Sequence, residues 1–300
     1  MSSLKIQISR FPGFRYPNMI RRGKIGATYF GPRLLQLTKW LFASREDTNF
    51  TYDITDASIN YLAHTIANVT HISVAQVIEY INEARYCTEL QGYVISKTLS
   101  SEDRERSDAK CQFGRRLGWY AFTRILKPSV IVETGIDKGL GSVLLCYGLL
   151  RNREEGFSGK YYGTDINQSA GWLLGPPYKD VGTILYGDSL ESLKSFSQSI
   201  DLFINDSDHS AEYEYQEYHT IMNKLSPGAV ILGDNSHCTN KLSLFSEETQ
   251  RDFLFFREDP TNHWYPGAGI GISFERDTTP KRCELAQIDG GYSGLHNPNN

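Results

Sequence analysis

Residues 129–142 read Ser-Val-Ile-Val-Glu-Thr-Gly-Ile-Asp-Lys-Gly-Leu-Gly-Ser, and this stretch decides the fold. A β-branched run at 130–132 is followed by a glycine-rich segment at 135–141 and by an apolar run from 143 to 150. That order predicts a strand, a glycine turn and a helix. Such a turn lets the backbone approach a ligand closely, and the start of the helix offers unpaired N–H groups to polar or anionic groups.

The acid and glycines of this turn are spaced as E-x-G-x-x-x-G, which differs from the dinucleotide fingerprint G-x-G-x-x-G. Asp137 stands where the second glycine would be, and its negative charge would repel a pyrophosphate. A cofactor without phosphates fits better. The turn resembles the first motif of class I S-adenosylmethionine (SAM)-dependent methyltransferases. The resemblance implies SAM contacts at Glu133, Gly135, Gly139 and Ser142. A plain strand-to-helix turn with packing glycines is the alternative.

Further apolar runs follow the first one and alternate with helical or turn-rich segments. Four of them end in an acid: 161–165, 183–188, 200–206 and 229–234. Two last runs, 253–257 and 269–274, suggest a closing hairpin. Alternating strands and helices predict an α/β fold with helices on both faces of a parallel sheet. A Rossmann-like, seven-stranded, mostly parallel sheet is the class I methyltransferase architecture, and the resemblance covers about residues 112–276.

The chain divides into four expected regions: a basic leader at 1–50, a helical cap or oligomerisation region at 51–110, the SAM-binding methyltransferase domain at 111–277 and a polar tail at 278–300. The leader holds Tyr16-Pro17-Asn18, which predicts a turn. The periodicity from Thr55 onward predicts a helix, and a second helix is expected to begin after Ser73 as its N-cap.

Charge is distributed unevenly along the chain. The net charge is −4, but residues 1–45 contain nine basic residues and no acidic one, so the remainder carries −13. Within the leader, residues 33–42 could form an amphipathic helix with basic residues at its margin. Packing on the body or on a subunit of a homo-oligomer is the favoured interpretation, and peripheral contact with a membrane is the alternative.

The composition is that of an ordinary soluble globular protein, with 40% hydrophobic and 22% charged residues. No apolar run reaches the roughly 20 residues that span a bilayer. The five cysteines are scattered and form no C-x-x-C pair. This argues for a reducing, cytoplasmic location and against a disulfide framework or a structural zinc site.

Two acids at strand ends complete the expected cofactor site. By resemblance, Asp165 would bind the ribose hydroxyls of SAM, and Asp188, with Ser189 beside it, would reach the adenine. Either acid could instead cap a helix. Parallel strands present their carboxyl ends at one edge of the sheet, so these residues and Glu133 are expected to converge on one crevice.

The segment Asn205-Asp206-Ser207-Asp208-His209, followed by Ser226-Pro227-Gly228 and by Asp234, carries the strongest local signal. It resembles metal-dependent small-molecule O-methyltransferases, in particular those acting on macrolide sugars and the cephalosporin-biosynthesis methyltransferase-like proteins.

The resemblance implies that His209 is the general base, that Asp206 is catalytic and that Asn205 lies at the cofactor. Carboxylate and amide oxygens suit Mg²⁺, so Asp206, Asp234 and Asn235 are the predicted metal ligands. Gly233 departs from the pattern because relatives often carry an acid there, and this keeps a metal-free version open. His209 could alternatively cap the following helix.

The predicted function is SAM-dependent O-methylation of a hydroxyl on a small molecule, such as a natural-product sugar or a polyketide, with assistance from Mg²⁺. No nucleic-acid partner is expected. A non-catalytic relative that keeps the fold for binding or assembly is the second hypothesis. A nucleotide-dependent oxidoreductase is the third, and Asp137 disfavours it.

Overall fold

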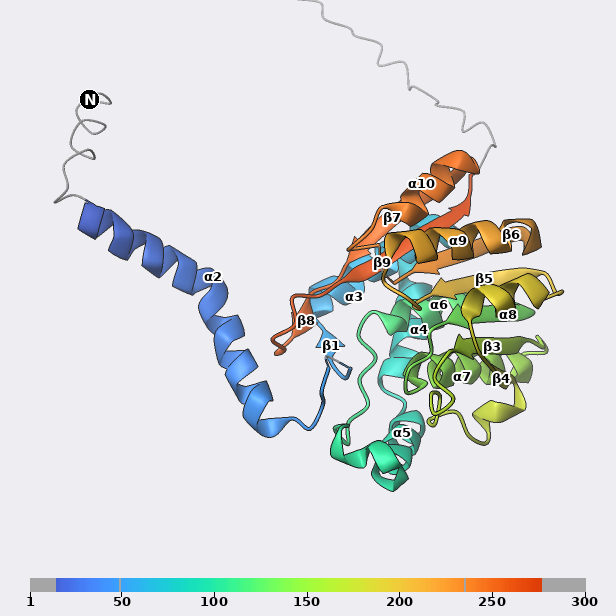
Figure 1. Cartoon of the computed structure of the whole chain (residues 1–300), viewed down its shortest axis with the longest axis horizontal. Helices are drawn as coiled ribbons and strands as arrows, with labels where there is room; N and C mark the ends of the chain where they lie inside the picture. The colour runs from blue at the N-terminus through green and yellow to red at the C-terminus, as the bar shows by residue number, and fades with distance from the viewer. Residues whose placement is uncertain (1–14, 49, 235, 277–300) are drawn as a thin grey trace, which may run out of the picture.

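The computed structural model describes residues 15–48, 50–234 and 236–276. The predicted tail at 278–300 and Asn235, one of the predicted metal ligands, lie outside the described residues. The chain forms an α/β sandwich preceded by one long helix (Figure 1). The N-terminal part contains α2 (Arg15–Ala43), β1 (Asp53–Ile54), α3 (Asp56–Thr70), α4 (Val74–Arg85), α5 (Thr88–Ser100), the 3₁₀ helix η2 (Glu102–Glu105) and α6 (Arg116–Leu126).

The remaining elements alternate strand and helix. They are β2 (Val130–Thr134), α7 (Leu140–Glu154), β3 (Lys160–Asp165), η3 (Tyr178–Asp180), β4 (Gly182–Tyr186), α8 (Ser189–Ser195), β5 (Ile200–Asn205), α9 (Ala211–Ile221), η4 (Met222–Lys224), β6 (Leu225–Gly233), α10 (Lys241–Glu248), β7 (Arg251–Arg257), β8 (Pro260–Thr261) and β9 (Gly269–Glu275).

The main sheet has seven strands in the order β4-β3-β2-β5-β6-β9-β7. Strands β2 to β6 pair in parallel, whereas β9 runs antiparallel to both β6 and β7. The predicted seven-stranded, mostly parallel Rossmann-like sheet with a closing antiparallel pair is therefore confirmed. Because β2 lies between β3 and β5, the strand order reverses at β2, which is where open α/β sheets bind ligands.

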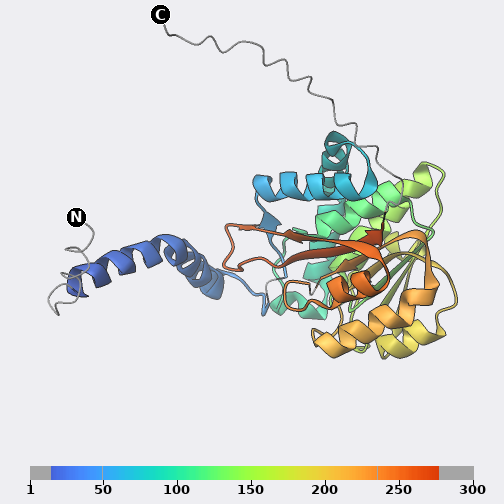
Figure 2. The same ribbon diagram turned by 90° about the horizontal axis from the view of Figure 1, so that it is seen from above.

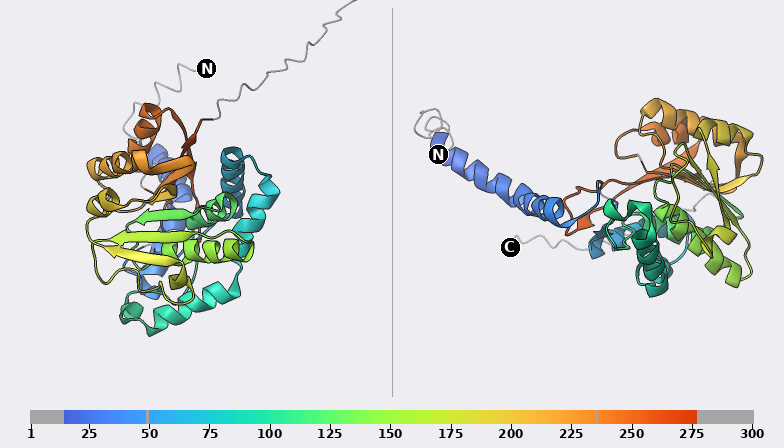
Figure 3. Two further views of the ribbon diagram at one scale, coloured as in Figure 1. Left: turned by 90° about the vertical axis from the view of Figure 1, so that its right-hand side faces the viewer. Right: turned by 60° about the horizontal axis from the view of Figure 1, so that its bottom comes forward.

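Helices cover both faces of this sheet (Figure 3). The pleat of β2 shows how the sequence divides between them, because alternate side chains of a strand point to opposite faces. Ile131 packs into the core beneath α3, α4, α6 and α7. Val130 and Val132 pack into the core beneath α8, α9 and α10. This division fixes which side each polar residue of β2 faces.

The region 51–110 forms three helices, of which α3 and α4 pack with α6 in the larger core. Thr55 caps α3 by accepting a hydrogen bond from the Ser58 N–H, and Ser73 caps α4 by accepting one from the Gln76 N–H. The predicted cap at Ser73 is confirmed. Strand β1 pairs with β8, which ties this region to the end of the sheet.

Helix α2 projects away from the rest of the chain (Figures 1 and 2). The expected turn at 16–18 is wrong, because these residues lie within α2; proline is tolerated in the first turn of a helix, where its missing N–H is not needed. Near its C-terminal end α2 contacts the body through Trp40, which packs on Trp264 at 5.1 Å between ring centroids. Among the described residues, no helix combines the length and apolar character needed to cross a membrane.

Candidate active site

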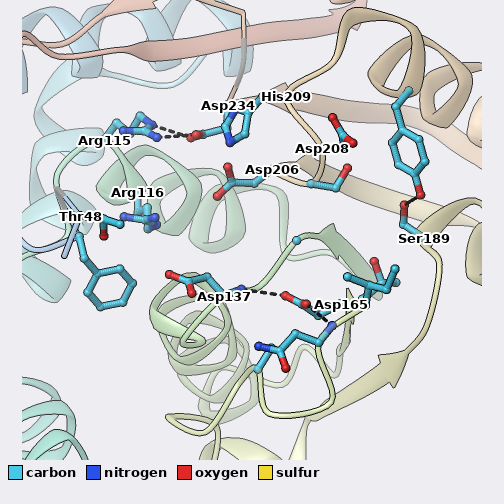
Figure 4. Close-up of a pocket in the computed structure, with 18 of the residues that line it drawn as sticks. Thr48, Arg115, Arg116, Asp137, Asp165, Ser189, Asp206, Asp208, His209 and Asp234 are labelled. Atoms are coloured by element: carbon cyan, nitrogen blue, oxygen red, sulfur yellow. Dashed lines mark hydrogen bonds and ion pairs between the residues drawn. The ribbon is translucent and has the colours of Figure 1, made fainter. Parts of the chain in front are cut away.

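A cavity of about 670 Å³ opens at the carboxyl ends of the five parallel strands. Its volume falls within the range of about 300–1,000 Å³ that is typical of small-molecule sites. The strand ends contribute Gly135, Asp165, Asp188, Asp206 and Asp234. The predicted convergence of strand-end acids is thus observed for four aspartates (Figure 4).

The glycine turn after β2 forms the floor of this cavity. Gly135 has a φ of 76°, and a Cβ added there would collide with the backbone carbonyl of Asp206. Glycine is needed at this position because the turn and the end of β5 approach each other closely. Asp137 adopts a left-handed conformation with a φ of 45° and lines the cavity, and burial raises the pKa of its carboxyl.

Asp165 holds the same turn from the end of β3. Its carboxylate accepts hydrogen bonds from the N–H groups of Ile136 and Asp137, at 3.2 and 3.0 Å, and from Asn167 at 2.8 Å. The carboxylate therefore orients the glycine turn while it lines the cavity (Figure 4).

Asp188 combines the two roles that were considered for it. It caps α8 by accepting a hydrogen bond from the Glu191 N–H at 3.0 Å, and it also lines the cavity. The hydroxyl of Tyr213 donates to its other oxygen at 2.9 Å. Ser189 follows it on the cavity wall.

Glu133 does not line the cavity, in contrast to the sequence-based expectation. It lies inside β2 with the same orientation as Ile131, so its carboxylate is buried between the sheet and α7. There it accepts hydrogen bonds from the hydroxyls of Tyr161 and Ser142. Burial raises the pKa of Glu133 to about 7. Ser142 is engaged by the same network, so the structure assigns both residues to packing of the strand against α7.

Gly139 and Asn205 also lie outside the cavity lining. Gly139 is the N-cap of α7 and approaches the backbone of Gly171. The side-chain amide of Asn205 donates to the buried carboxylate of Glu217 on α9. Glu217 also accepts hydrogen bonds from the hydroxyls of Thr134, Ser189 and Ser207, so it ties together the ends of β2, β4 and β5 behind the cavity. Sequence reasoning missed Glu217, which lies mid-helix without a local motif.

A buried ion cluster occupies the end of β6. The Arg115 guanidinium binds Asp234 in a bidentate manner, with Nε and Nη2 each donating to one carboxylate oxygen. Nη1 donates to Glu258 at 3.1 Å and to the Tyr52 hydroxyl, which in turn donates to Glu258 at 2.9 Å. Arg115, Asp234 and Glu258 are at most 7% exposed. The guanidinium holds the pKa of Asp234 at about 2, against the opposing effect of burial.

This cluster does not fit the predicted magnesium site. Both oxygens of Asp234 are already hydrogen-bonded to a fixed positive charge, and a divalent cation beside that charge would be repelled. Among residues 15–48, 50–234 and 236–276, no group of three or more histidine, cysteine or acidic side chains is arranged to hold a metal ion. Asp206 and Asp234 are therefore assigned no metal role, and Asn235 lies outside the described residues.

Asp206 and His209 both line the cavity, as the sequence predicted. Burial and the neighbouring Asp234 carboxylate raise the pKa of Asp206 well above its usual range. The negative charge of Asp234 therefore favours the protonated form of the Asp206 carboxyl. His209 lies on the exposed loop between β5 and α9, with its side chain free to meet a ligand.

Several lining residues have no signal in the sequence. Arg116 begins α6, with its guanidinium 5.5 Å from the Trp119 ring centroid and 5.8 Å from that of Phe50. Phe50 forms part of the wall, as do Tyr52, Tyr213 and Tyr265. His237 and Tyr265 also line the cavity, whereas His263 and Trp264 are not among its lining residues.

The comparison with protein families agrees with this geometry. Residues 132–236 match a family model described as a methyltransferase domain. This segment runs from within β2 to just beyond β6 and includes every strand end that lines the cavity. The strand order confirms the predicted fold, and residues 132–236 are similar to a methyltransferase domain. The narrower resemblance to macrolide-sugar enzymes stays a prediction.

No characterised protein matches the chain by sequence. Solved structures resemble it. The SAH-bound methyltransferase PaMTH1 of Podospora anserina is 17% identical with a TM-score of 0.45, over 63% of this chain and 88% of that one. A methyltransferase from Geobacter sulfurreducens is 16% identical with a TM-score of 0.45, over 62% and 90%. The SAM-bound O-methyltransferase TomG of Streptomyces achromogenes is 12% identical with a TM-score of 0.42, over 62% and 89%.

The position of Glu133 leads to a testable pH dependence. Its pKa rises from 4.5 to about 7 on folding, so its protonation stabilises the fold fully below pH 4.5, and this contribution is lost as the pH rises through about 7. Glu133→Gln removes the titrating group. In urea unfolding between these pH values, Glu133 makes the free energy of unfolding fall with pH by up to about 1.4 kcal/mol per pH unit. The slope measured for the variant should be more positive by this amount.

Glu79→Gln is the matched control, because Glu79 is exposed on α4 and the slope should not change. Burial also raises the pKa of Glu217 to about 7, so this carboxyl titrates in the wild type and in both variants alike. An unchanged slope in Glu133→Gln would contradict the assigned burial of this carboxyl.

Proposed function

We propose that the protein transfers a methyl group from SAM to a hydroxyl of a small molecule. The observation that carries the proposal is the charge of the cavity. Its described lining holds six aspartates, at 137, 165, 188, 206, 208 and 234, and two arginines, at 115 and 116. The sulfonium and the ammonium of SAM are both cations, so an acidic cavity attracts them and repels a dinucleotide pyrophosphate.

The lining residues suggest how SAM would be held. Asp165 and Asp188 end neighbouring strands and offer carboxylate oxygens to the ribose hydroxyls and the adenine amino group. Asp137 would face the methionine ammonium, and Arg116 would bind the methionine carboxylate. Gly135 leaves room for the ligand above the turn.

Methyl transfer from a sulfonium is an in-line displacement in which the acceptor oxygen attacks the methyl carbon and the sulfur leaves as a thioether. A neutral hydroxyl is a weak nucleophile until its proton is removed. We assign this proton to His209, because histidine is the side chain that most often acts as a general base and this one lies on the cavity wall. The Arg115–Asp234 pair and protonated Asp206 would orient the acceptor by hydrogen bonds.

Cofactor binding is tested by calorimetry with SAM, its demethylated product, NAD and NADP. SAM should bind, and Asp165→Asn should weaken its binding by about 1.5 to 3 kcal/mol, which is typical of a hydrogen bond to a charged group. Asp180→Asn, at an exposed position away from the cavity, should bind SAM normally. Tighter binding of NAD than of SAM would instead support the oxidoreductase.

The role of His209 is tested with isotopically labelled SAM and a panel of hydroxylated small molecules. With an acceptor that is methylated, His209→Ala should lower the rate by about 10² to 10⁴-fold and leave SAM affinity unchanged. His219→Ala is the matched control, since His219 lies on α9 against Glu248 and outside the cavity lining. Full activity of the His209 variant would remove the base assignment.

Metal independence follows from the pairing of Asp234 with Arg115. Turnover should persist in a strong chelator, and Mn²⁺ titrated into the protein should show no stoichiometric site by electron paramagnetic resonance. Loss of turnover in chelator with recovery in Mg²⁺, or a Mn²⁺ site that disappears in Asp206→Asn, would contradict this expectation.

A further inference from the structure

Helix α2 exposes large apolar side chains to an extent found nowhere else in the described chain. Nine of them are more than half exposed: Met19, Ile20, Ile25, Tyr29, Phe30, Leu34, Leu35, Leu41 and Phe42. Isolated exposed apolar residues are ordinary, but a contiguous set marks a surface that binds something. The figures show that the body does not cover this helix (Figures 1 and 2).

Several apolar side chains of α2 lie together on one side of the helix. At 100° per residue, one sector of about 100° contains no charged residue. Its members are Met19, Ile20, Ala27, Phe30, Leu34, Leu37 and Leu41. Basic residues flank the sector: Arg22 and Arg33 on one side and Lys24 on the other. Arg21 and Lys39 lie nearly opposite its centre. We call this arrangement the basic-apolar face of α2.

The sequence of α2 is a poor helix former without such a contact. Gly23, Gly26, Gly31 and Pro32 lie in its interior, and each costs about 1 to 3 kcal/mol relative to alanine. Pro32 also removes a backbone hydrogen bond, and α2 is bent along its length (Figure 1). A helix of this composition gains its stability from burying its apolar face rather than from its intrinsic propensity.

We propose that the basic-apolar face of α2 docks on an anionic lipid surface. Lysine and arginine at the two margins of an apolar sector would reach the lipid headgroups while their neighbours insert below them. No acidic residue occurs in residues 1–45, so nothing on this segment opposes attraction to an anionic bilayer. A second copy of α2 would instead bring two basic helices together without a compensating acid.

The connection to the body favours the same occupant. Trp40 packs on Trp264 of the body, and the Arg33 guanidinium lies 3.8 Å from the Asp259 carboxylate. Helix α2 is therefore attached near its C-terminal end. The remainder of the chain carries −13 and would be repelled by an anionic bilayer, which leaves α2 as the segment that makes contact. This proposal is independent of the catalytic one.

Vesicle sedimentation of the full chain tests the proposal. The protein should pellet with vesicles of phosphatidylcholine mixed with phosphatidylglycerol, remain in the supernatant with phosphatidylcholine alone, and be released by high salt. The double variant Arg22→Gln, Lys24→Gln should bind about 25-fold more weakly, at about fivefold for each charge removed.

A matched pair of substitutions distinguishes the two sides of α2. Leu34→Ser removes an apolar group from the centre of the basic-apolar face and should weaken vesicle binding by about thirtyfold. Ile25→Ser removes a similar group from the opposite side of the helix and should leave binding unchanged. Equal effects of the two substitutions, or equal pelleting with neutral vesicles, would refute the proposal. A dimer seen by light scattering that Leu34→Ser dissociates, without vesicle binding, would assign the face to a second copy instead.

Discussion

The cavity wall is held together by the buried ion cluster around Arg115. Arg115 lies just before α6, and its guanidinium binds Tyr52 before β1, Asp234 at the end of β6 and Glu258 after β7. Its backbone N–H also donates to Glu258, and so does the Tyr52 hydroxyl. Buried charges persist only when every partner is in place, and removing one partner of such a cluster costs about 3 to 5 kcal/mol. The same ion pair keeps Asp234 ionised, and the Asp234 carboxylate in turn favours the protonated form of Asp206. One interaction thus shapes the wall of the cavity and sets its charge.

The order of strands and helices was predictable because it depends on local patterns. Apolar runs ending in acids, glycine turns and the cap at Ser73 are each encoded within a few neighbouring residues. The Arg115–Asp234 pair is not, because its members are 119 residues apart and no local pattern relates one to the other. Helix α2 shows a further limit. Tyr16-Pro17-Asn18 indicated a turn, yet these residues are helical, because proline is tolerated in the first turn of a helix. Only the later apolar spacing at 33–42 indicated the helix.

Side-chain direction explains which site residues the sequence placed correctly. Asp165 is the last residue of β3, Asp206 directly follows β5, and Asp188 lies two residues beyond the end of β4. Their side chains therefore lie at the sheet edge and meet the cavity. Glu133 lies one residue inside β2, where the pleat fixes its direction toward α7, and the next residue, Thr134, points to Glu217 on the other face. A shift of one residue along a strand reverses the face. The motif spacing gave the position of Glu133 along the chain but not its orientation.

The segment between α2 and β1 connects the exposed helix to the cavity. Asp108 accepts hydrogen bonds from the Ser44 hydroxyl and the Arg45 N–H, both at 2.9 Å, which holds the start of this segment on the loop after η2. A few residues later, Thr48, Phe50 and Tyr52 form part of the cavity wall, and Tyr52 joins the Arg115 cluster. Because the wall begins within five residues of the end of α2, a surface that holds α2 also determines which side of the cavity faces it. If α2 lies on an anionic bilayer as proposed, the acceptor would approach the cavity along that surface.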